Sequence, residues 1–330
     1  MFTHKDIFDS FAQDALKKYG LEKTCKAELL QLSENITYLI QDEKTGKKTV
    51  LRISRPGYHT IEELDSELLW LKEIKSYTPL IVADPIKGLN GSYIQLIRSW
   101  MINDTYVCIL YEFLEGKIPD ETDEATIVNH FVRLGETTAY LHKHAKMWNH
   151  ADRLSRFVWD YDTMLGSNPR WGRWQAARDL TKKDKELLER TSAVIKGRLE
   201  KYGKNKHNFG LIHADLRLAN LLIEDDIIKV IDFDDCGFGW FMHDLASAVS
   251  FIEAKPITEK LIENWLIGYQ KIEPILKTDL DEIDTFIMQR RLQLLAWLTS
   301  HSDSDPVKEL SIGYADGSIN LAEKYLTKYN

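Results

Sequence analysis

Short runs of alternating apolar and polar residues, interrupted by two helical stretches, fill the first 114 positions of the chain. Residues 3–19 repeat apolar positions at helical spacing until Gly20, and Thr60-Ile61-Glu62-Glu63 forms a capping box that opens a second helix to about residue 76. Three strands, one helix and two strands follow in order after the first helix, which indicates a small antiparallel sheet carrying a helix rather than an alternating βαβ series. The predicted strands are residues 26–32, 36–41, 48–54, 93–99 and 106–114.

The apolar spacing becomes helical after a hinge predicted at Glu115-Gly116-Lys117. Two short apolar runs around a polar turn at residues 224–226 are the exception and indicate a hairpin. The pattern therefore predicts an α+β chain of two lobes, a β-rich lobe over residues 1–114 and a mainly helical lobe over residues 115–330. Helices are predicted at residues 123–144, 181–202, 246–254, 257–271, 280–300 and 310–329, and the hairpin strands at 221–223 and 228–231.

Composition narrows the class of protein. The 330 residues are 44% hydrophobic and 28% charged, which is ordinary for a soluble enzyme. A net charge of −8 disfavours nucleic acid as a partner, because neutralising phosphates requires an excess of Lys and Arg. The three cysteines have no metal-ligand spacing and indicate a reducing compartment. No signal peptide and no apolar stretch of membrane-spanning length is present, so a cytoplasmic protein without a membrane partner is expected.

The residues best suited to catalysis lie between Leu211 and Asp235. Asp215 follows His213 by two positions, Asn220 follows Asp215 by five, and Asp232 ends an apolar strand. This spacing matches the catalytic loop of protein kinases. A carboxylate at Asp215 can take the proton of an acceptor hydroxyl, and the side-chain oxygens of Asn220 and Asp232 are ligand types that Mg²⁺ prefers. The hairpin between them is expected to place Asn220 and Asp232 side by side at its open end.

The same residues resemble the aminoglycoside phosphotransferase and choline kinase-like family, which has the protein-kinase-like fold. The resemblance is nearest to the branch of bacterial homoserine kinases, spore-coat kinase-like proteins and a stress-response Ser/Thr kinase. It includes His243-Asp244-Leu245-Ala246, which is similar to a Tyr-Asp-Leu-Ala segment with His243 in place of Tyr, and it also includes Trp159-Asp160 and Arg170-Trp171-Gly172. The resemblance implies ATP and Mg²⁺ as cofactors, with His213 and Asp244 supporting the catalytic loop.

The resemblance extends less sharply to the nucleotide-binding side. Arg52 stands on the third strand where the family has a Lys or Arg that contacts the α- and β-phosphates, and a planar guanidinium suits that contact. Glu67 on the following helix is the expected partner of Arg52, with Glu63 one turn earlier as the competitor. The turn that would cover the phosphates has no glycine. Further implied nucleotide contacts are Ser33, Asn35 and the backbone groups of Glu112 and Phe113.

Several residues admit two interpretations. Asp234 and Asp235 fit either extra metal ligands or a rim that attracts a cationic substrate, and equally a solvated turn. Arg290 and Arg291 could line the substrate site, but a solvated basic pair is the favoured interpretation. The lysine-rich segment 181–185 is expected to be an exposed helix start, and the tryptophans between residues 148 and 174 are expected to pack in the core or a lid.

Four functions remain open at this stage. The first is transfer of the ATP γ-phosphate to the hydroxyl of a small molecule, such as an amino alcohol, amino acid or aminoglycoside, by a monomer or a homodimer. The second is a Ser/Thr protein kinase, which Ala214 and the short segment 233–243 disfavour because no phosphorylatable activation segment fits there. The third is a metal-dependent hydrolase whose metal ligands would be His213, Asp215, Asp232, Asp234 and His243. The fourth is a nucleotide-binding scaffold without activity.

Overall fold

The chain divides into two units, each with its own sheet. The computed structural model describes residues 4–32, 35–98, 104–120, 123–225, 227–302 and 305–329. Unit 1 comprises Met1–Tyr77 and Ile81–Gly116, and unit 2 comprises Thr78–Leu80 and Lys117–Asn330. Among the described residues, no helix combines the length and the apolarity that crossing a membrane would need.

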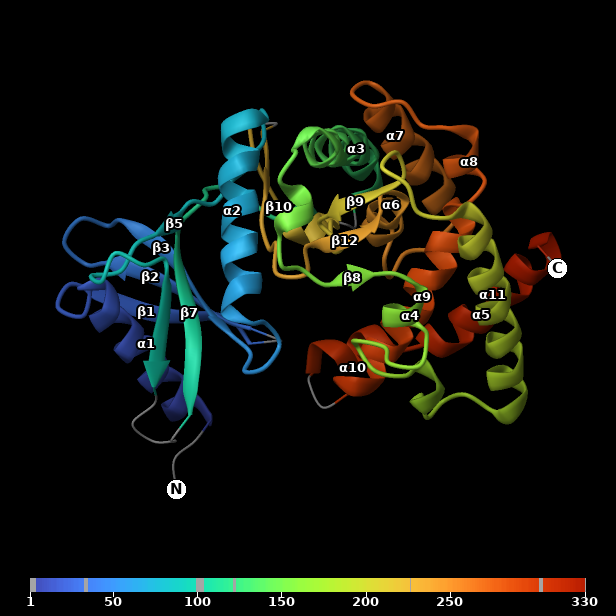
Figure 1. Cartoon of the computed structure of the whole chain (residues 1–330). Helices are drawn as coiled ribbons and strands as arrows, with labels where there is room; N and C mark the ends of the chain where they lie inside the picture. The colour runs from blue at the N-terminus through green and yellow to red at the C-terminus, as the bar shows by residue number, and fades with distance from the viewer. Residues whose placement is uncertain are drawn as a thin grey trace. The chain divides into compact units, whose positions relative to one another are not determined.

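Unit 1 is built on an antiparallel sheet whose strands follow the order β1-β2-β3-β7-β5, with β6 also paired to β7 (Figure 1). The capping box predicted at Thr60 is confirmed, because Thr60 N donates to Glu63 Oε2 at 2.9 Å and Glu63 N donates to Thr60 Oγ1 at 3.2 Å. The elements are α1 (His4–Tyr19), β1 (Cys25–Leu32), β2 (Ile36–Asp42), β3 (Lys48–Ser54), α2 (Ile61–Tyr77), β4 (Ile81–Val82), β5 (Pro85–Ile86), β6 (Ile94–Arg98) and β7 (Thr105–Glu112).

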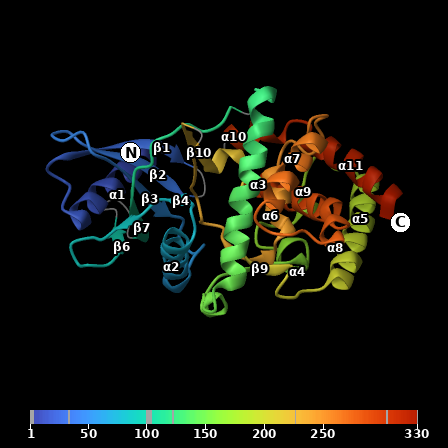
Figure 2. The ribbon, with the colours of Figure 1, turned by 90° about the horizontal axis from the view of Figure 1, so that it is seen from above.

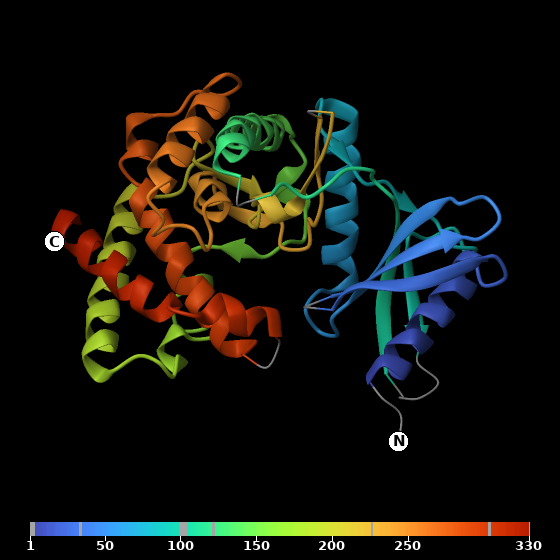
Figure 3. The same cartoon turned by 180° about the vertical axis from the view of Figure 1, so that it is seen from behind.

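Strand β3 turns its two faces toward different helices. Leu51 and Ile53 are buried in the apolar cluster that includes Phe11 of α1. Arg52 lies between them in sequence, so the two-residue period of a strand points it to the opposite face. There it meets Glu67 of α2. Helices α1 and α2 accordingly lie on opposite sides of the sheet (Figure 3).

Unit 2 contains most of the helices, a three-stranded sheet in the order β8-β12-β9 and the hairpin β10-β11. Its helices are α3 (Glu124–Met147), α4 (Tyr161–Met164), α5 (Lys182–Tyr202), α6 (Met242–Ala248), α7 (Thr258–Gln270), α8 (Lys277–Leu280), α9 (Ile283–Ser300), α10 (Asp305–Ser311) and α11 (Tyr314–Tyr329). Its strands are β8 (Val158–Trp159), β9 (Phe209–Ile212), β10 (Leu221–Glu224), β11 (Ile227–Val230) and β12 (Gly237–Trp240). Short 3₁₀ turns occupy Ala151–Arg153, Trp174–Ala176 and Leu218–Asn220.

Helices α3 and α7 pack side by side with almost no space between their backbones (Figure 2). A Cβ atom on Gly135 would lie 2.0 Å from the carbonyl oxygen of Trp265, and one on Gly268 would lie 1.9 Å from that of Val132. Only glycine permits so close an approach. Helix α9 is buried around nearly its whole circumference, against α5, α6, α10 and α11.

Two predicted helices of unit 2 had wrong bounds, and three of its strands were not predicted. The helix expected at residues 246–254 is α6, which begins four residues earlier and ends at Ala248. The helix expected at residues 310–329 is divided, because Gly313 takes a φ of +68° between α10 and α11. Strands β8, β9 and β12 were not predicted. They have two to four residues each, and the glycines of β12 weaken the strand pattern.

Candidate active site

The hairpin places Asn220 and Asp232 at its open end, as the sequence predicted. Leu221 pairs with Val230 in the antiparallel register. One step further out, Ile231 N donates to Asn220 O at 3.0 Å. Asp232 follows directly, exposed and with a φ of +62°, a left-handed conformation that is rare for a residue other than glycine. Such backbone strain is concentrated at functional sites.

Asn220 holds the loop of residues 213–220 by its amide nitrogen. Asn220 Nδ2 donates to the backbone oxygen of Asp215 at 2.8 Å and to its carboxylate Oδ2 at 2.9 Å. These two bonds use both amide hydrogens and fix the side-chain plane. The carbonyl oxygen of Asn220 is then the atom that can serve as a ligand to a cation.

Asp244 takes part in three hydrogen bonds, two of which come from backbone amides of the loop. Ala214 N donates to its Oδ1 at 2.7 Å, His213 N donates to its Oδ2 at 3.1 Å, and His142 Nε2 lies 3.0 Å from the same Oδ2. Asp244 is fully buried. Burial alone would raise the pKa of its carboxyl group, but the hydrogen bond with His142 lowers this pKa, so the carboxylate is ionised at neutral pH. These are the contacts that an anchoring role requires.

His213 links the loop to the hairpin. Its Nδ1 accepts from the Asp215 N–H at 3.4 Å, so Nε2 carries the hydrogen that is shared with Ile231 O at 3.1 Å. The ring is completely buried, and burial lowers its pKa below the usual range. A neutral imidazole with both nitrogens occupied is a structural bridge rather than a metal ligand or a general base.

The expectation that Arg290 and Arg291 form a solvated pair was wrong. Arg290 is 1% exposed and Arg291 is 4% exposed. Arg290 Nη2 donates to Asp215 Oδ1 at 2.6 Å, whereas Arg291 Nη1 pairs with Glu253 Oε2 at 2.7 Å. The signal in the sequence was the apolar surroundings of both arginines, since charged residues on a helix buried on all sides must find partners inside the protein.

The segment after Asp232 is held by its backbone. Asp234 is 5% exposed, and its carbonyl oxygen accepts a hydrogen bond from Arg156. The carbonyl oxygen of Asp235 accepts from Trp159 Nε1 at 2.7 Å. The solvated-turn interpretation therefore does not describe Asp234, while Asp235 is half-buried. Trp159 is buried too, in keeping with the expected core packing.

In unit 1, the third strand and the following helix form a buried ion pair. Arg52 Nη1 and Nη2 each donate to one Glu67 oxygen at 2.8 Å, and Glu67 is 1% exposed. The structure thus brings Glu67 rather than Glu63 to Arg52. Tyr111 adds a contact, with its Oη 3.4 Å from Glu67 Oε1 and its ring 5.4 Å from the Arg52 guanidinium. A bidentate pair of this kind fixes the guanidinium plane.

The structure gives fewer contacts for the other residues predicted to bind the nucleotide. Asn35 Oδ1 accepts from Arg55 N at 3.3 Å, and Ser33 lies outside the described residues. Glu112 N donates to Asp84 O at 2.8 Å, so this N–H is not free for a base. The carbonyl group of Glu112 and the backbone of Phe113 stay predictions.

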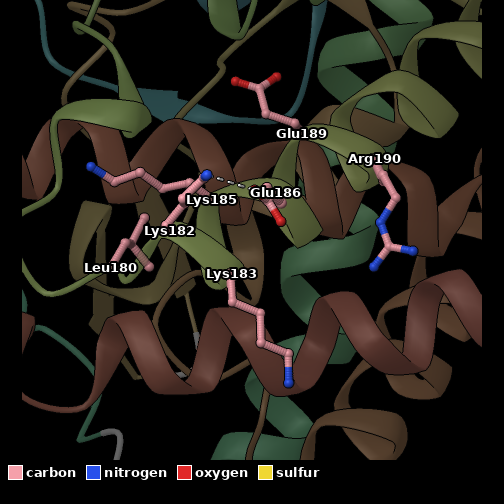
Figure 4. A pocket seen from close by; sticks show the side chains of 7 residues that line it. All are labelled: Leu180, Lys182, Lys183, Lys185, Glu186, Glu189 and Arg190. Atoms are coloured by element: carbon pink, nitrogen blue, oxygen red, sulfur yellow. Dashed lines mark ion pairs between the residues drawn. The ribbon is translucent and has the colours of Figure 1, made fainter.

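A surface hollow at the start of α5 contains none of the predicted site residues (Figure 4). Thr181 caps this helix, and the Lys182 side chain is 93% exposed. Lys182 and Glu186 approach to 3.9 Å, an exposed pair that contributes at most about 0.5 kcal/mol. The lysine-rich segment is therefore a solvated helix start, as predicted.

Donor atoms for a dedicated metal centre are not grouped together. Within the described part of the chain, no three His, Cys, Asp or Glu side chains gather in a way that could hold a metal ion. The two-metal hydrolase hypothesis is disfavoured because it needs His213 as a ligand, and both ring nitrogens of His213 are occupied. The pair Asn220 and Asp232 fits a Mg²⁺ ion that takes its other ligands from phosphates and water.

Comparisons of sequence and of structure relate the chain to known proteins. A family model described as "Phosphotransferase enzyme family" matches residues 28–284. The chain is similar to the solved structure of a microcompartment-associated aminopropanol kinase, with 38% identity, a TM-score of 0.87, and coverage of 96% of this chain and 97% of that chain. It is 23% identical over 322 residues to the amicoumacin kinase of Bacillus subtilis (strain 168), covering 93% and 91% of the two chains.

A third relative shares the fold at lower identity. An amicoumacin kinase solved with AMP-PNP, Ca²⁺ and Ami has a TM-score of 0.75 and 20% identity, with 96% of each chain covered. Spectinomycin phosphotransferase and an ethanolamine kinase of Plasmodium vivax align over 95% and 98% of this chain. The predicted protein-kinase-like fold class is confirmed.

Proposed function

Because the chain belongs to the phosphotransferase enzyme family, we propose that it transfers the γ-phosphate of ATP to the hydroxyl group of a small amino alcohol. Its kinase relatives act on small molecules by name, and at 38% identity the aminopropanol kinase makes aminopropanol the first acceptor to test. The observation that carries the proposal is the contact between Asp215 and Asn220 at the open end of the hairpin. This contact unites a base with a cation ligand, which phosphoryl transfer requires.

In the proposed reaction the acceptor oxygen forms a bond to Pγ while the bond between Pγ and the bridging oxygen of ADP breaks. The hydroxyl proton passes to the carboxylate of Asp215 and from there to solvent, and ADP and the phosphorylated acceptor leave. Arg52, fixed by Glu67, contacts the α- and β-phosphates. Asn220 and Asp232 would hold Mg²⁺, which when bound spreads the negative charge of the phosphates.

A charge argument favours an acceptor that carries an amine. Besides Asp215, the segment after Asp232 contributes the carboxylates of Asp234 and Asp235. Fixed negative charge beside an acceptor attracts an ammonium group and disfavours an anionic metabolite. An amino alcohol has both groups that this acceptor needs, a hydroxyl group to be phosphorylated and an ammonium group to interact with the carboxylates.

The test is an ADP-release screen with ATP and Mg²⁺ over amino alcohols, amino acids, aminoglycosides and sugars. We expect turnover with aminopropanol or a related amino alcohol, and a loss of about 10²- to 10⁴-fold in Asp215→Asn, the range for removing a general base. ATP affinity should stay within about threefold of wild type, because Asp215 carries no predicted nucleotide contact. Unchanged turnover in Asp215→Asn would eliminate Asp215 as the base.

A further inference from the structure

Asp215 shares its carboxylate with a buried cation that the general scheme of phosphoryl transfer does not include. Arg290 lies in the middle of α9, 75 positions along the chain from Asp215, and places Nη2 2.6 Å from Asp215 Oδ1. Its side chain is 2% exposed, against 19% for that of Asp215. The guanidinium is therefore deep in unit 2, and the base stands at its outer side.

The guanidinium of Arg290 is fixed independently of Asp215. Its Nε donates to Ser250 Oγ at 3.3 Å, and its Nη1 donates to Gln293 Oε1 at 3.1 Å. Its Cζ lies 4.9 Å from the centre of the Trp171 ring. Three contacts with three different segments determine the position and the plane of the group, so Asp215 adapts to Arg290 rather than the reverse.

The second carboxylate oxygen is held from the catalytic loop itself. Asn220 Nδ2 donates to Asp215 Oδ2 at 2.9 Å, and Arg217 Nε lies 3.5 Å from the same oxygen. With one oxygen bound from α9 and the other from the loop, the carboxylate cannot rotate about its Cβ–Cγ bond without losing a hydrogen bond. The lone pair that receives a proton is thereby aimed in one direction.

We propose that Arg290 is a positioning residue for the reaction, which orients the Asp215 carboxylate toward the acceptor hydroxyl. The inference rests on the proposed function, since it assigns Asp215 as the base. The competing explanation is a buried ion pair that only joins α9 to the loop. Misplacing a catalytic group by about 1 Å costs on the order of 10²-fold in rate, whereas a purely structural pair costs stability and leaves the rate of the folded enzyme unchanged.

Arg291 supplies a matched control on the same helix. It is buried like Arg290 and forms its own ion pair with Glu253 at 2.7 Å, but it bonds to Ser318 and Tyr314 rather than to the catalytic loop. Arg290→Met and Arg291→Met therefore remove equally buried charges. Loss of folding free energy is expected in both, and loss of turnover only in Arg290→Met.

The experiment measures kcat and KM for aminopropanol and for ATP, and urea unfolding, in wild type, Arg290→Met, Arg290→Lys and Arg291→Met. We expect kcat to fall about 10²-fold in Arg290→Met with KM for ATP within about threefold of wild type. Arg290→Lys should recover part of kcat, because it keeps the charge but not the planar fork. Arg291→Met should keep kcat within about threefold.

Two further readouts make the outcome decisive. Millimolar guanidinium should restore turnover in Arg290→Ala and have no such effect in Arg291→Ala. If wild type does not phosphorylate aminopropanol, that proposed acceptor is wrong, and the same variants are compared in acceptor-free ATP hydrolysis, where Asp215 orients water. Equal kcat losses at both positions, or full turnover in Arg290→Lys and Arg290→Met, would overturn the role of Arg290. If Arg290→Met does not fold, the kcat of Arg290→Lys decides alone. A kcat below that of Arg291→Met supports the role of Arg290, and a kcat equal to that of Arg291→Met overturns it.

Discussion

His243 should make the folded chain sensitive to acid in a way that one substitution removes. The residue lies in α6 and is 1% exposed. Burial lowers the pKa of its imidazole from 6.5 to about 3, and the positive charge of Arg290 acts in the same direction. In the unfolded chain the same imidazole returns to its ordinary pKa.

The sign and size of the effect follow from that difference. The folded state binds fewer protons than the unfolded state between pH 6.5 and pH 3, so the stability contributed by neutral His243 is present above pH 6.5 and is lost as the pH falls through this window. Each pH unit within this window changes the free energy of unfolding by about 1.4 kcal/mol. At about pH 4.5, two pH units below the unfolded pKa, roughly 3 kcal/mol of this stability should be lost.

The perturbation is His243→Tyr, which introduces the residue of the similar family segment and does not titrate in this range. Urea unfolding followed by tryptophan fluorescence at about pH 7 and pH 4.5 gives the free energies. Between about pH 7 and pH 4.5, the free energy of unfolding should fall by about 2 to 3 kcal/mol less in His243→Tyr than in wild type. His207→Tyr, at an exposed position, serves as the control and should parallel wild type. Equal pH dependence in wild type and His243→Tyr would refute the buried neutral imidazole.

Further predictions concern the ion pair of Arg52 and Glu67 and the replacement of two glycines. Glu67→Gln removes the counter-charge of the buried Arg52 and should cost about 3 kcal/mol of stability and weaken ATP binding in a titration, whereas Glu63→Gln keeps the capping box and should change stability by less than about 0.5 kcal/mol. Gly268→Ala should destabilise unit 2 by about 3 kcal/mol or more in urea unfolding, because its Cβ meets backbone. Gly197→Ala, where a Cβ has open space, should instead stabilise α5 by about 0.5 kcal/mol.

Local patterns in the sequence were sufficient where the chain itself brings the residues together. Asn220 and Asp232 are joined by one hairpin, so their spacing alone placed them side by side. Strand parity gave the face of Arg52, and the family resemblance gave Glu67 as its partner, with Glu63 left as a competitor that the structure excludes. The capping box at Thr60 gave the start of α2 to within a residue.

Contacts between distant segments were beyond such patterns. His142 in α3 reaches Asp244 across 102 positions, and Arg290 reaches Asp215 across 75. Nothing in the spacing of either pair indicates a contact, because both depend on how helices pack around α6 and α9. Strands of two to four residues, such as β8 and β9, are likewise too short to produce an alternation that differs from loop sequence.

The carboxylate of Asp244 has a consequence for how the enzyme would be controlled in a cell. It is part of the folded core, and its pKa is held below the usual range, so it is ionised at neutral pH and orders the loop it supports without chemical modification. We expect metabolic flux through the enzyme to follow the abundance of the protein and the concentrations of its two substrates, and a mutant screen for hyperactive, deregulated forms to return none.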